Sequence, residues 1–554
     1  MTSCPGIGSV GAKMKRKCPE AIGPLVPPPG KSHPQRHVGS PLLRSQSMER
    51  STRHRHRGAR MGIGVLVALA TACGSTGTGS SGTTPTSPSS TPAPRPSLPP
   101  PTPITWSPCP DGSTLRCATV SVPVDYQHPA DGSITLALTQ SPALDGTDPR
   151  GTLLFNPGGP GESGNQILPV VLGLLPPEVR QQYNIVGFDP RGTGASDPLQ
   201  CGTAPSAVTS VLPVPARSGQ PLPGTPAFTT MARACAKQTS YEPFISTVNT
   251  ARDMDRIRQA LGLSSISFYG MSYGTVLGAA YADLFPRHVA MMILDGAVDV
   301  NATLTQQAIQ QAPAAERSLA HLFATCVASS CPLGPDPASF YRSLTSSLST
   351  HPLPAPGNGD THPITVGDLD TATLFALSVP AATSAYYAAL LAARNGDGEP
   401  LRAQALEFAT DVNGAPLVDP QWAITCNDAA DHPSPTAAGD LARSLAARTP
   451  LIGAYAVTYN MGGCVSWPHA REPVVDLHPK GTPPILVIGN TGDPNTPLVG
   501  ARHLAAIFPE AGELTWQGWG HTWLLSGSND TCMQQRVTTY LSGGGLPPAG
   551  TVCR

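Results

Sequence analysis

Hydrophobic and polar positions follow two different periods along the chain from about residue 104 onward. Residues 117–126 and 133–140 alternate apolar and polar side chains, which is the pattern of strands with one buried face. Residues 151–157 and 184–192 begin as short apolar runs and end in turns rich in glycine and proline. Such runs are typical of strands buried on both faces. The first part of the chain is therefore predicted to build a sheet.

Helical periodicity alternates with the later strand signals. Residues 250–263 and 273–285 carry apolar side chains at helical spacing, and Pro286 ends the second stretch. Residues 265–270 and 291–296 are apolar runs of strand length. This strand–helix rhythm predicts an α/β fold, in which a mainly parallel central sheet is flanked by helices.

The pattern changes after the strand signal at residues 291–296. Residues 301–480 are irregular and mostly helical in character, rich in alanine, leucine and proline. Strand signals return at 484–490 and 513–516. We therefore predict a core formed by residues 104–300 and 481–554, interrupted by an inserted, mostly helical lid at residues 301–480.

The N-terminal hundred residues have the pattern of a targeting segment rather than of a folded domain. Residues 1–47 match no targeting class and are left unassigned, as disordered chain or an upstream start. Residues 48–73 contain a basic stretch and then twelve apolar residues that end at small side chains, which is typical of a secretory signal and too short to span a bilayer. Residues 74–103 are a Ser/Thr/Gly/Pro tether that we expect to be disordered.

Cys73 directly follows the apolar stretch of the signal. A signal that ends at a cysteine before a polar tether resembles that of a bacterial lipoprotein, in which the cysteine carries lipid. Ala70 departs from the usual pattern, since leucine is commoner three residues before such a cysteine. Ordinary cleavage near Ala72 is the alternative. We expect a secreted protein or a cell-surface lipoprotein that contacts the membrane only through such an anchor.

Charge and cysteine content narrow the function. The formal net charge is −1, so no overall basic field favours nucleic acid as a partner.

Ten of the thirteen cysteines lie after Cys73, and an even number in an exported chain indicates disulfides. Zinc is the competing use, but no Cys-x₂-Cys pair with suitable histidines exists, so neither a metal nor a cofactor is expected. Nearness along the chain suggests Cys109–Cys117, Cys201–Cys235, Cys326–Cys331, Cys532–Cys553 and, by remainder, Cys426–Cys464, with other connectivities still open.

The chemistry is carried first by Gly-Met-Ser-Tyr-Gly at residues 270–274. Glycines two before and two after Ser272 let the chain turn sharply from a strand into a helix, which exposes the serine hydroxyl. The five-residue pattern alone is weak, because chance gives about half a match in a chain of this length. The strand before it and the helix after it make Ser272 a predicted nucleophile of an α/β-hydrolase.

A serine nucleophile needs a histidine base and an acid that orients it. In this fold both follow the serine along the chain, each on a loop after a strand. Asp493 follows the strand at 484–490, and His521 follows the strand at 513–516. Asp295 is the rival acid, because it comes directly after the strand signal at 291–294. We predict Ser272, Asp493 and His521 as the triad.

The developing oxyanion needs backbone donors. The Tyr273 amide follows the nucleophile, and the loop at residues 156–161 carries three glycines that let its backbone come close to a substrate. We predict the amides of Tyr273 and Gly159 as the oxyanion hole, with Gly158 as the near alternative to Gly159.

Several motifs in order, from residue 117 to residue 553, resemble those of a known family. They include the segments 156–164, 187–198, 269–289 and 489–497. The chain is similar to the secreted tripeptidyl aminopeptidase-like branch of the prolyl aminopeptidase family of α/β-hydrolases. The family's triad falls on the three residues already chosen. Pro157 stands where prolyl aminopeptidases have histidine, as in the tripeptidyl branch.

The resemblance implies a serine exopeptidase that releases tripeptides or short N-terminal units from peptides with a free N-terminus. Such an enzyme must bind an α-amine, and in prolyl relatives the acids that do so come from the lid. Asp428 is our first candidate because a disulfide at Cys426 would fix its position, and Glu162 is the second. Arg191 is interpreted as a buried arginine that ties loops together.

Two other classes of function stay open at this point. A carboxylesterase or lipase could use the same triad, and a noncatalytic binding protein could keep the fold alone. The joint presence of nucleophile, acid, base and oxyanion loop argues against the noncatalytic class.

Overall fold

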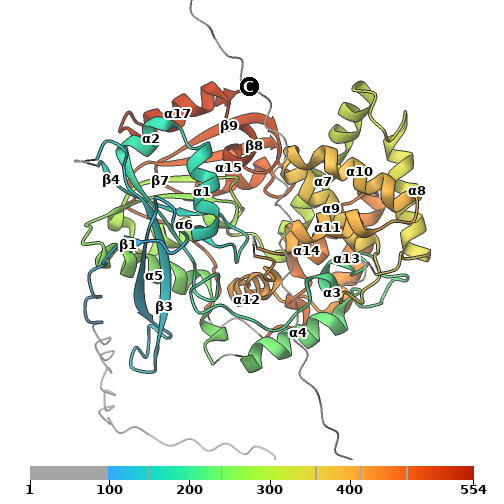
Figure 1. Cartoon of the computed structure of the whole chain (residues 1–554), viewed down its shortest axis with the longest axis horizontal. Coiled ribbons are helices and arrows are strands. Elements are labelled where there is room, and N and C mark those ends of the chain that lie inside the picture. Colours follow the sequence, from blue (N-terminus) through green and yellow to red (C-terminus); the bar gives the residue numbers. More distant parts are fainter. Residues whose placement is uncertain (1–97, 147–148, 239, 356–358, 412, 469–471) are drawn as a thin grey trace, which may run out of the picture. The chain divides into compact units, whose positions relative to one another are not determined.

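The strand-forming segments assemble into one ten-stranded sheet in the computed structural model, which describes residues 98–554 except 147–148, 239, 356–358, 412 and 469–471. The strand order is β1-β2-β3-β5-β4-β6-β7-β8-β9-β10 (Figure 1). The strands are β1 (Ser107–Pro108), β2 (Arg116–Pro123), β3 (Ser133–Ser141), β4 (Gly151–Asn156), β5 (Tyr183–Phe188), β6 (Ile266–Met271), β7 (Val289–Asp295), β8 (Ile485–Gly492), β9 (Ala511–Trp519) and β10 (Thr551–Cys553).

The sheet is mainly parallel, as predicted. Each neighbouring pair in the series β5, β4, β6, β7, β8, β9 and β10 is parallel, and the β1–β2, β2–β3 and β3–β5 pairs are antiparallel. Every residue of β6 is buried, whereas β3 alternates buried and exposed positions along its first half. A central strand with both faces covered and an outer one with a solvent face account for these two patterns.

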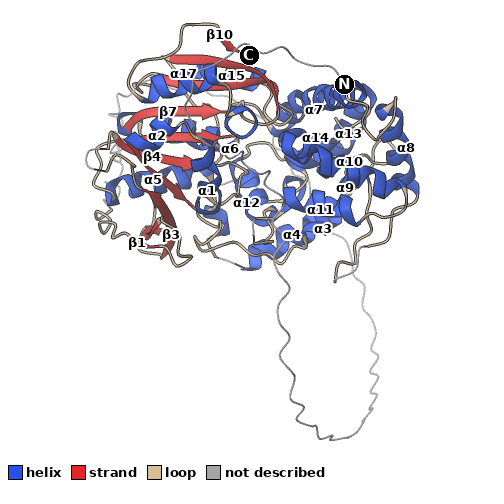
Figure 2. Ribbon diagram, turned by 45° about the horizontal axis from the view of Figure 1, so that its top comes forward, coloured by secondary structure: helices blue, strands red, loops and turns tan. Residues whose placement is uncertain are grey.

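Helices cover both faces of the sheet, and alternate side chains of each strand meet different helices. Leu154 and Phe268 face one layer of helices, while Leu153 and Tyr269 face the other. Figure 2 shows the strands gathered in one part of the molecule with helices around them. The first layer is α5 (Thr247–Ala260), α6 (Tyr273–Leu284) and α15 (Leu498–Ile507), and the second is α1 (Gly164–Leu174), α2 (Pro177–Gln182), α16 (Trp523–Gly527) and α17 (Thr531–Leu541).

The lid has a hydrophobic core of its own between β7 and β8. Buried side chains such as Leu319, Leu369, Tyr386 and Leu401 pack together in a cluster separate from those of the sheet. Its helices are α7 (Leu304–Ala328), α8 (Pro337–Thr350), α9 (Val366–Ser378), α10 (Thr383–Arg394), α11 (Glu399–Ala409), α12 (Val418–Asp428), α13 (Pro435–Arg448) and α14 (Tyr455–Met461). Helices α12 and α13 bury their apolar side chains in the cluster of the sheet's first helix layer instead. Single-turn 3₁₀ helices are η3 (Pro380–Ala382) and η4 (Cys464–Ser466) within the lid, and η1 (Glu242–Phe244) and η2 (Pro286–His288) before it.

A second excursion from the sheet joins the lid. Helices α3 (Pro205–Thr209) and α4 (Thr225–Gln238) lie between β5 and α5 in sequence. The Thr209 hydroxyl donates to Asp368 over 2.8 Å, and the Leu222 amide donates to the Pro435 carbonyl over 2.8 Å. Our sequence division counted this stretch with the core, because its turn-rich pattern gives no sign of where it packs.

All five expected cysteine pairs are present as disulfides. They join Cys109 to Cys117, Cys201 to Cys235, Cys326 to Cys331, Cys426 to Cys464 and Cys532 to Cys553. The pairing predicted from nearness along the chain is confirmed. Disulfides persist in oxidising compartments, so this content is consistent with an exported protein.

Arg191 lies fully buried in the loop after β5, and the structural interpretation is confirmed. Its guanidinium donates to both carboxylate oxygens of Asp253, over 2.7 and 2.6 Å, and to the carbonyls of Val124, Phe244 and Pro123. A buried charge of this kind must be paired and hydrogen bonded to be tolerated. Arg191 therefore ties the loop after β5 to helix α5 and to the end of β2.

Within the part of the chain that the structure describes, no helix has both the length and the apolar character needed to cross a membrane. The predicted signal segment and Cys73 lie outside the described residues, as do residues 74–97 of the tether.

Candidate functional site

Ser272 sits at the turn between β6 and α6 in a backbone conformation that non-glycine residues rarely adopt, with φ 53° and ψ −123°. Its amide donates to the Asp295 carbonyl over 2.9 Å. A Cβ on Gly270 would lie 2.3 Å from the Gly274 carbonyl oxygen, and one on Gly274 would lie 2.8 Å from the Asn156 carbonyl oxygen. The two glycines are therefore required for the turn to close.

Asp493 and His521 form a hydrogen-bonded pair. His521 Nδ1 lies 3.0 Å from each carboxylate oxygen of Asp493. The Asp493 side chain is fully buried and the His521 side chain is 12% exposed. The residue after the histidine, Thr522, places its Oγ1 3.9 Å from the sulfur of Met271, which directly precedes Ser272. The structure thus brings the loops of all three predicted triad residues together.

The Asp493 carboxylate is held by four further donors. Its Oδ1 accepts the amides of Asn495 and Thr496 over 2.9 and 2.8 Å, and its Oδ2 accepts the Thr496 hydroxyl over 3.0 Å and the Thr522 amide over 3.1 Å. Sequence reasoning missed Thr496. The available signal was its position three residues after an aspartate in a turn, because the carboxylate of such an aspartate accepts hydrogen bonds from the residues that follow it.

The electrostatic surroundings of His521 favour its protonated form. Burial lowers its pKa, but the nearby carboxylate of Asp493 outweighs this effect, and Asp295 and Glu162 act in the same direction. The pKa of His521 is therefore raised above its ordinary value. An oriented imidazole with a raised pKa is a stronger base once deprotonated, which suits proton abstraction from a hydroxyl.

Asp295, the rival acid, has different partners. Its carboxylate accepts the amides of Trp523 and Leu524 over 2.9 and 3.0 Å and the Tyr269 hydroxyl over 3.0 Å. Burial raises its pKa to about 6. No hydrogen bond joins Asp295 to His521, both of which the structure describes. His521 is hydrogen bonded to Asp493, and Asp493 as the catalytic acid stays a prediction.

The glycine loop after β4 lies against the nucleophile. A Cβ on Gly158 would be 3.0 Å from the Cβ of Ser272 and 3.2 Å from the Tyr273 amide nitrogen. The Gly158 amide is already used, since it donates to Asn156 Oδ1 over 3.1 Å. The Gly159 amide has no such partner among the described residues, and Tyr273 begins a helix, where the first amides are free of intrahelical bonds. This geometry favours Gly159 over Gly158, and the oxyanion hole stays a prediction.

A cavity of about 370 Å³ opens beside the nucleophile, between the sheet and the lid. Ser272, Tyr273 and Gly159 line its core side, and Asp428 and Tyr459 lie on the lid side. No lysine or arginine is among the residues that line it, all of which are described. Further lining side chains are the amides and acids Asn301, Gln307, Gln310, Gln311, Gln421, Asn460, Asn495, Asp299, Asp431 and Asp476.

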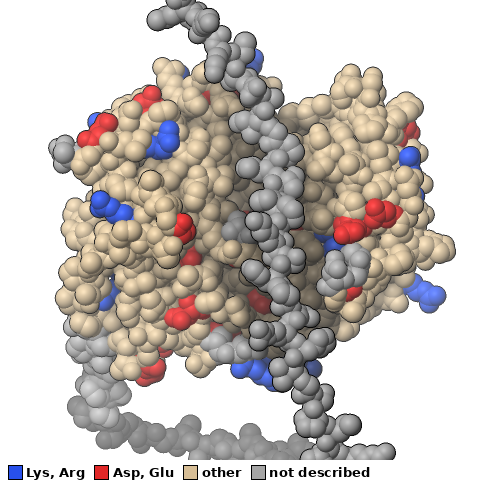
Figure 3. All heavy atoms as spheres, viewed as in Figure 1, with Lys and Arg blue, Asp and Glu red and all other residues tan. Residues whose placement is uncertain are grey.

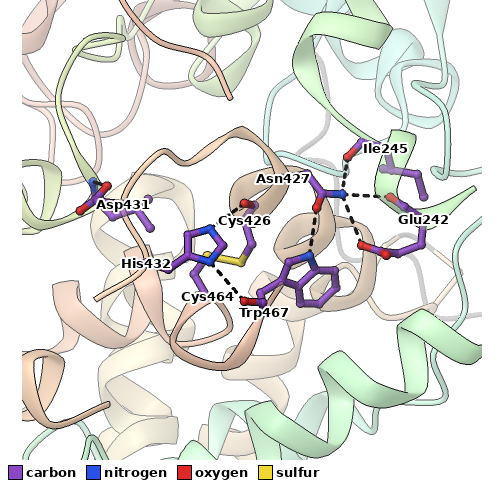
Figure 4. Close-up of a disulfide and its surroundings, with 9 residues drawn as sticks. Glu242, Ile245, Cys426, Asn427, Asp431, His432, Cys464 and Trp467 are labelled. Carbon is purple, nitrogen blue, oxygen red and sulfur yellow. Dashed lines mark hydrogen bonds between the residues drawn. A yellow bond between two sulfur atoms is a disulfide. The ribbon is translucent and has the colours of Figure 1, made fainter. Parts of the chain in front are cut away.

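Asp428 ends helix α12, and this end is rigidly held. Figure 4 shows the Cys426–Cys464 disulfide next to the Asn427 side chain, which donates to the Glu242 and Ile245 carbonyls over 2.9 and 3.0 Å. Asn427 Oδ1 accepts the Trp467 indole N–H over 3.0 Å. The disulfide that our sequence argument required is therefore present beside Asp428.

The Asp428 carboxylate also connects the lid to Tyr273, the residue after Ser272. It accepts the amide and hydroxyl of Thr247 over 2.8 and 2.5 Å, and the Thr247 hydroxyl is in turn bonded to the Tyr273 hydroxyl. Burial raises the pKa of Asp428 to about 7, although the Thr247 bonds lower it. A carboxylate in that position gains from a cation that enters the cavity.

Glu162, the second candidate, does not line the cavity. It is half-buried behind the glycine loop, where a Cβ on Gly159 would lie 3.3 Å from its Cγ. Burial raises its pKa to about 7, and the charge of His521 opposes this. Its place is beside the histidine rather than in the space where a substrate fits.

Charged side chains are sparse and mixed in sign on the face of the molecule drawn in Figure 3. Neither sign of charge dominates this face.

Comparisons with known proteins agree with the geometry. The family model described as TAP-like protein matches residues 449–553. Serine protease Hip1 of Mycobacterium tuberculosis is 32% identical over 486 residues, which cover 81% of this chain and 91% of Hip1. Carboxylesterase B of Mycobacterium tuberculosis is 31% identical over 475 residues, 79% of this chain and 86% of the relative. Tripeptidyl aminopeptidase of Streptomyces coelicolor is 28% identical over 487 residues, 81% and 86% of the two chains.

These similarities extend over the core and the lid together, and the sheet order with its strand–turn–helix serine is that of an α/β-hydrolase. The chain therefore belongs to the TAP-like family of α/β-hydrolases and is a serine hydrolase.

Proposed function

We propose that this protein is an exported serine exopeptidase that cleaves short units from the free N-terminus of peptides, with Ser272, Asp493 and His521 as its triad. The observation that carries the proposal is the strained serine turn, which opens on the same cavity as the glycine loop and lies beside the hydrogen-bonded Asp493–His521 pair.

In the proposed reaction Ser272 Oγ attacks the scissile carbonyl while His521 Nε2 takes the hydroxyl proton. Asp493 accepts a hydrogen bond from Nδ1–H of the histidine and so fixes the tautomer that leaves Nε2 free as the base. The amides of Tyr273 and Gly159 stabilise the oxyanion. His521 then gives its proton to the leaving amine, and water, activated by the same histidine, hydrolyses the acyl-enzyme.

Asp428 is the proposed anchor for the substrate's α-ammonium group. It lines the cavity that contains Ser272, and no basic side chain lines that cavity to compete for it. Three extended residues span about 10–11 Å, so an anchor at that distance from the nucleophile would select tripeptide units. Glu162 is proposed only as a second negative group near the histidine.

Asp428→Asn is expected to raise KM for free-amine tripeptide substrates by about ten- to a hundredfold, because a charge-assisted contact is lost. Hydrolysis of N-acetylated ester substrates should keep its KM. Steady-state kinetics on the two substrate types measure the difference.

The matched control for this prediction is Asp431→Asn, which removes a second carboxylate from the same cavity. A similar rise in KM there would assign the effect to the cavity's overall charge. An equal loss on free and acetylated substrates in Asp428→Asn would instead mean that Asp428 only supports Thr247 and the serine turn. A wild-type enzyme that prefers blocked N-termini would contradict the exopeptidase proposal altogether.

A carboxylesterase with the same triad is the second candidate, favoured by the 31% identity to the relative named carboxylesterase B. Chromogenic tripeptidyl, prolyl and acyl-ester substrates, assayed side by side, separate the two. Faster turnover of the acyl ester, with no tripeptide cleavage, would support the esterase.

We also propose that Cys73 carries a lipid anchor in the mature protein. Mass spectrometry of the mature N-terminal peptide is expected to find a diacylglyceryl group on Cys73, and Cys73→Ala should release the enzyme from the membrane fraction, since acyl chains supply the attachment. A free N-terminus at another residue would leave a secreted enzyme without an anchor.

A further inference from the structure

The lid is joined to both loops that carry the Asp493–His521 pair. Ser378, the last residue of lid helix α9, is buried, and its carbonyl oxygen accepts the backbone amide of His521 over 3.0 Å. Its hydroxyl oxygen accepts the Asn495 side-chain amide over 2.9 Å. One residue of the lid therefore contacts the histidine itself and the loop of the acid.

The contacts around Ser378 fix it from both sides. Its hydroxyl donates to the Leu374 carbonyl over 2.6 Å within α9, so the oxygen is oriented to accept from Asn495. Asn495 in turn donates its own backbone amide to Asp493 Oδ1 over 2.9 Å. A continuous chain of hydrogen bonds thus runs from the lid helix to the catalytic carboxylate.

Lid helix α7 contacts the same acid loop independently. The Ser318 hydroxyl donates to the carbonyl of Gly492, and the Gln311 side chain donates to the carbonyl of Asn495, over 3.2 and 3.3 Å. The His321 ring stacks on the Trp519 ring, with centroids 3.7 Å apart and planes 4° apart, two residues before His521. Helices α7 and α9 of the lid therefore both contact the loops that carry Asp493 and His521.

We propose that Ser378 is a positioning residue for the proposed reaction: through its carbonyl and hydroxyl oxygens, lid helix α9 holds the Asp493 and His521 loops in the register that the triad needs. The inference rests on the proposed triad. The lid then acts as part of the catalytic scaffold as well as a cover over the cavity. Small displacements of the reacting groups lower the rate strongly, so loss of these contacts is expected to lower kcat.

Ser378 does not line the cavity, so its loss leaves substrate binding alone. Ser378→Ala is expected to lower kcat about three- to tenfold on an acyl-ester substrate, with KM unchanged, because one neutral hydrogen bond to the acid loop is lost while the carbonyl contact stays. The acid limb of the kcat/KM profile should move to lower pH, because a looser Asp493 raises the pKa of His521 less. Ser378→Thr keeps the hydroxyl and should retain kcat.

Ser329→Ala is the control. Ser329 directly follows lid helix α7 and is exposed; its hydroxyl donates to the carbonyl four residues before it, as that of Ser378 does, but it makes no hydrogen bond to either catalytic loop. Asn495→Ala removes the same bond from the other side and serves if Ser378→Ala does not fold. Because both variants break one bond, the double variant should lose no more kcat than Asn495→Ala alone.

Wild-type kcat and pH profile in a folded Ser378→Ala would overturn the proposal. So would an equal fall in Ser329→Ala, or losses that add fully in the double variant. Ser272→Ala, assayed on the same ester, separates a failure of the positioning role from a failure of the proposed triad. If Ser272→Ala is inactive and Ser378→Ala is not impaired, the positioning role fails while the proposed triad stands.

Discussion

Ser272→Ala is expected to abolish covalent labelling by a fluorophosphonate probe and to lower kcat on ester and peptide substrates by a factor on the order of 10⁶. The probe and the substrate both require the Oγ that this change removes. Alanine also carries a Cβ, so the backbone at φ 53° meets no new steric demand and the fold should be retained. Active-site labelling, followed on a gel, and thermal unfolding measure the two effects.

The control for this experiment is Ser343→Ala, an exposed serine on lid helix α8. It should label and turn over as the wild type does. Continued labelling of Ser272→Ala at the wild-type rate would place the nucleophile on another residue. The unfolding temperature is measured alongside, because an unfolded variant would also lose labelling.

The serine turn could be predicted from sequence because its causes are local. Two glycines flank the serine at fixed spacing, a strand precedes it and an apolar helix follows. The structure explains why both glycines are needed, since a Cβ on Gly270 would meet the Gly274 carbonyl at 2.3 Å. The parallel sheet was predictable for the same reason, because each strand and helix carries its own periodicity.

The choice between two acids could only be weighed from sequence. Asp295 ends β7, and Asp493 follows β8, which pairs with β7. Both carboxylates therefore reach the same edge of the sheet, and only the direction of each side chain separates them. Asp295 turns toward the amides of Trp523 and Leu524, whereas Asp493 turns toward the imidazole.

The lid's role at the site had no signal in the sequence. Ser378 contacts His521 across 143 positions of the chain, and neither residue type nor spacing marks a helix-ending serine as a partner of a histidine amide. The same holds for helices α3 and α4, which pack with the lid although they precede α5 in sequence. Contacts of this kind depend on how separate elements pack, which local periodicity does not encode.

Asp493→Asn is expected to lower kcat by a factor on the order of 10³–10⁴ while the fold is kept. Asn495 and Thr496 both donate their amides to Oδ1, so the asparagine oxygen is expected at that position. Its NH₂ group then occupies the Oδ2 position, 3.0 Å from Nδ1 of His521. A donor there favours the tautomer with the proton on Nε2, which cannot accept the proton of Ser272.

The pH dependence provides a second measurement on the same variant. The Asp493 carboxylate raises the pKa of His521, so activity of the wild type falls as pH drops through that raised value. In Asp493→Asn this support is lost and the acid limb of kcat/KM should move to lower pH.

Asp295→Asn is the matched control, because it removes an equally buried carboxylate that makes no bond to the histidine, and its kcat should fall less than tenfold. If Asp295→Asn showed the thousandfold loss and Asp493→Asn did not, the acid would be Asp295, and the hydrogen bond between Asp493 and His521 would not be the one used in catalysis.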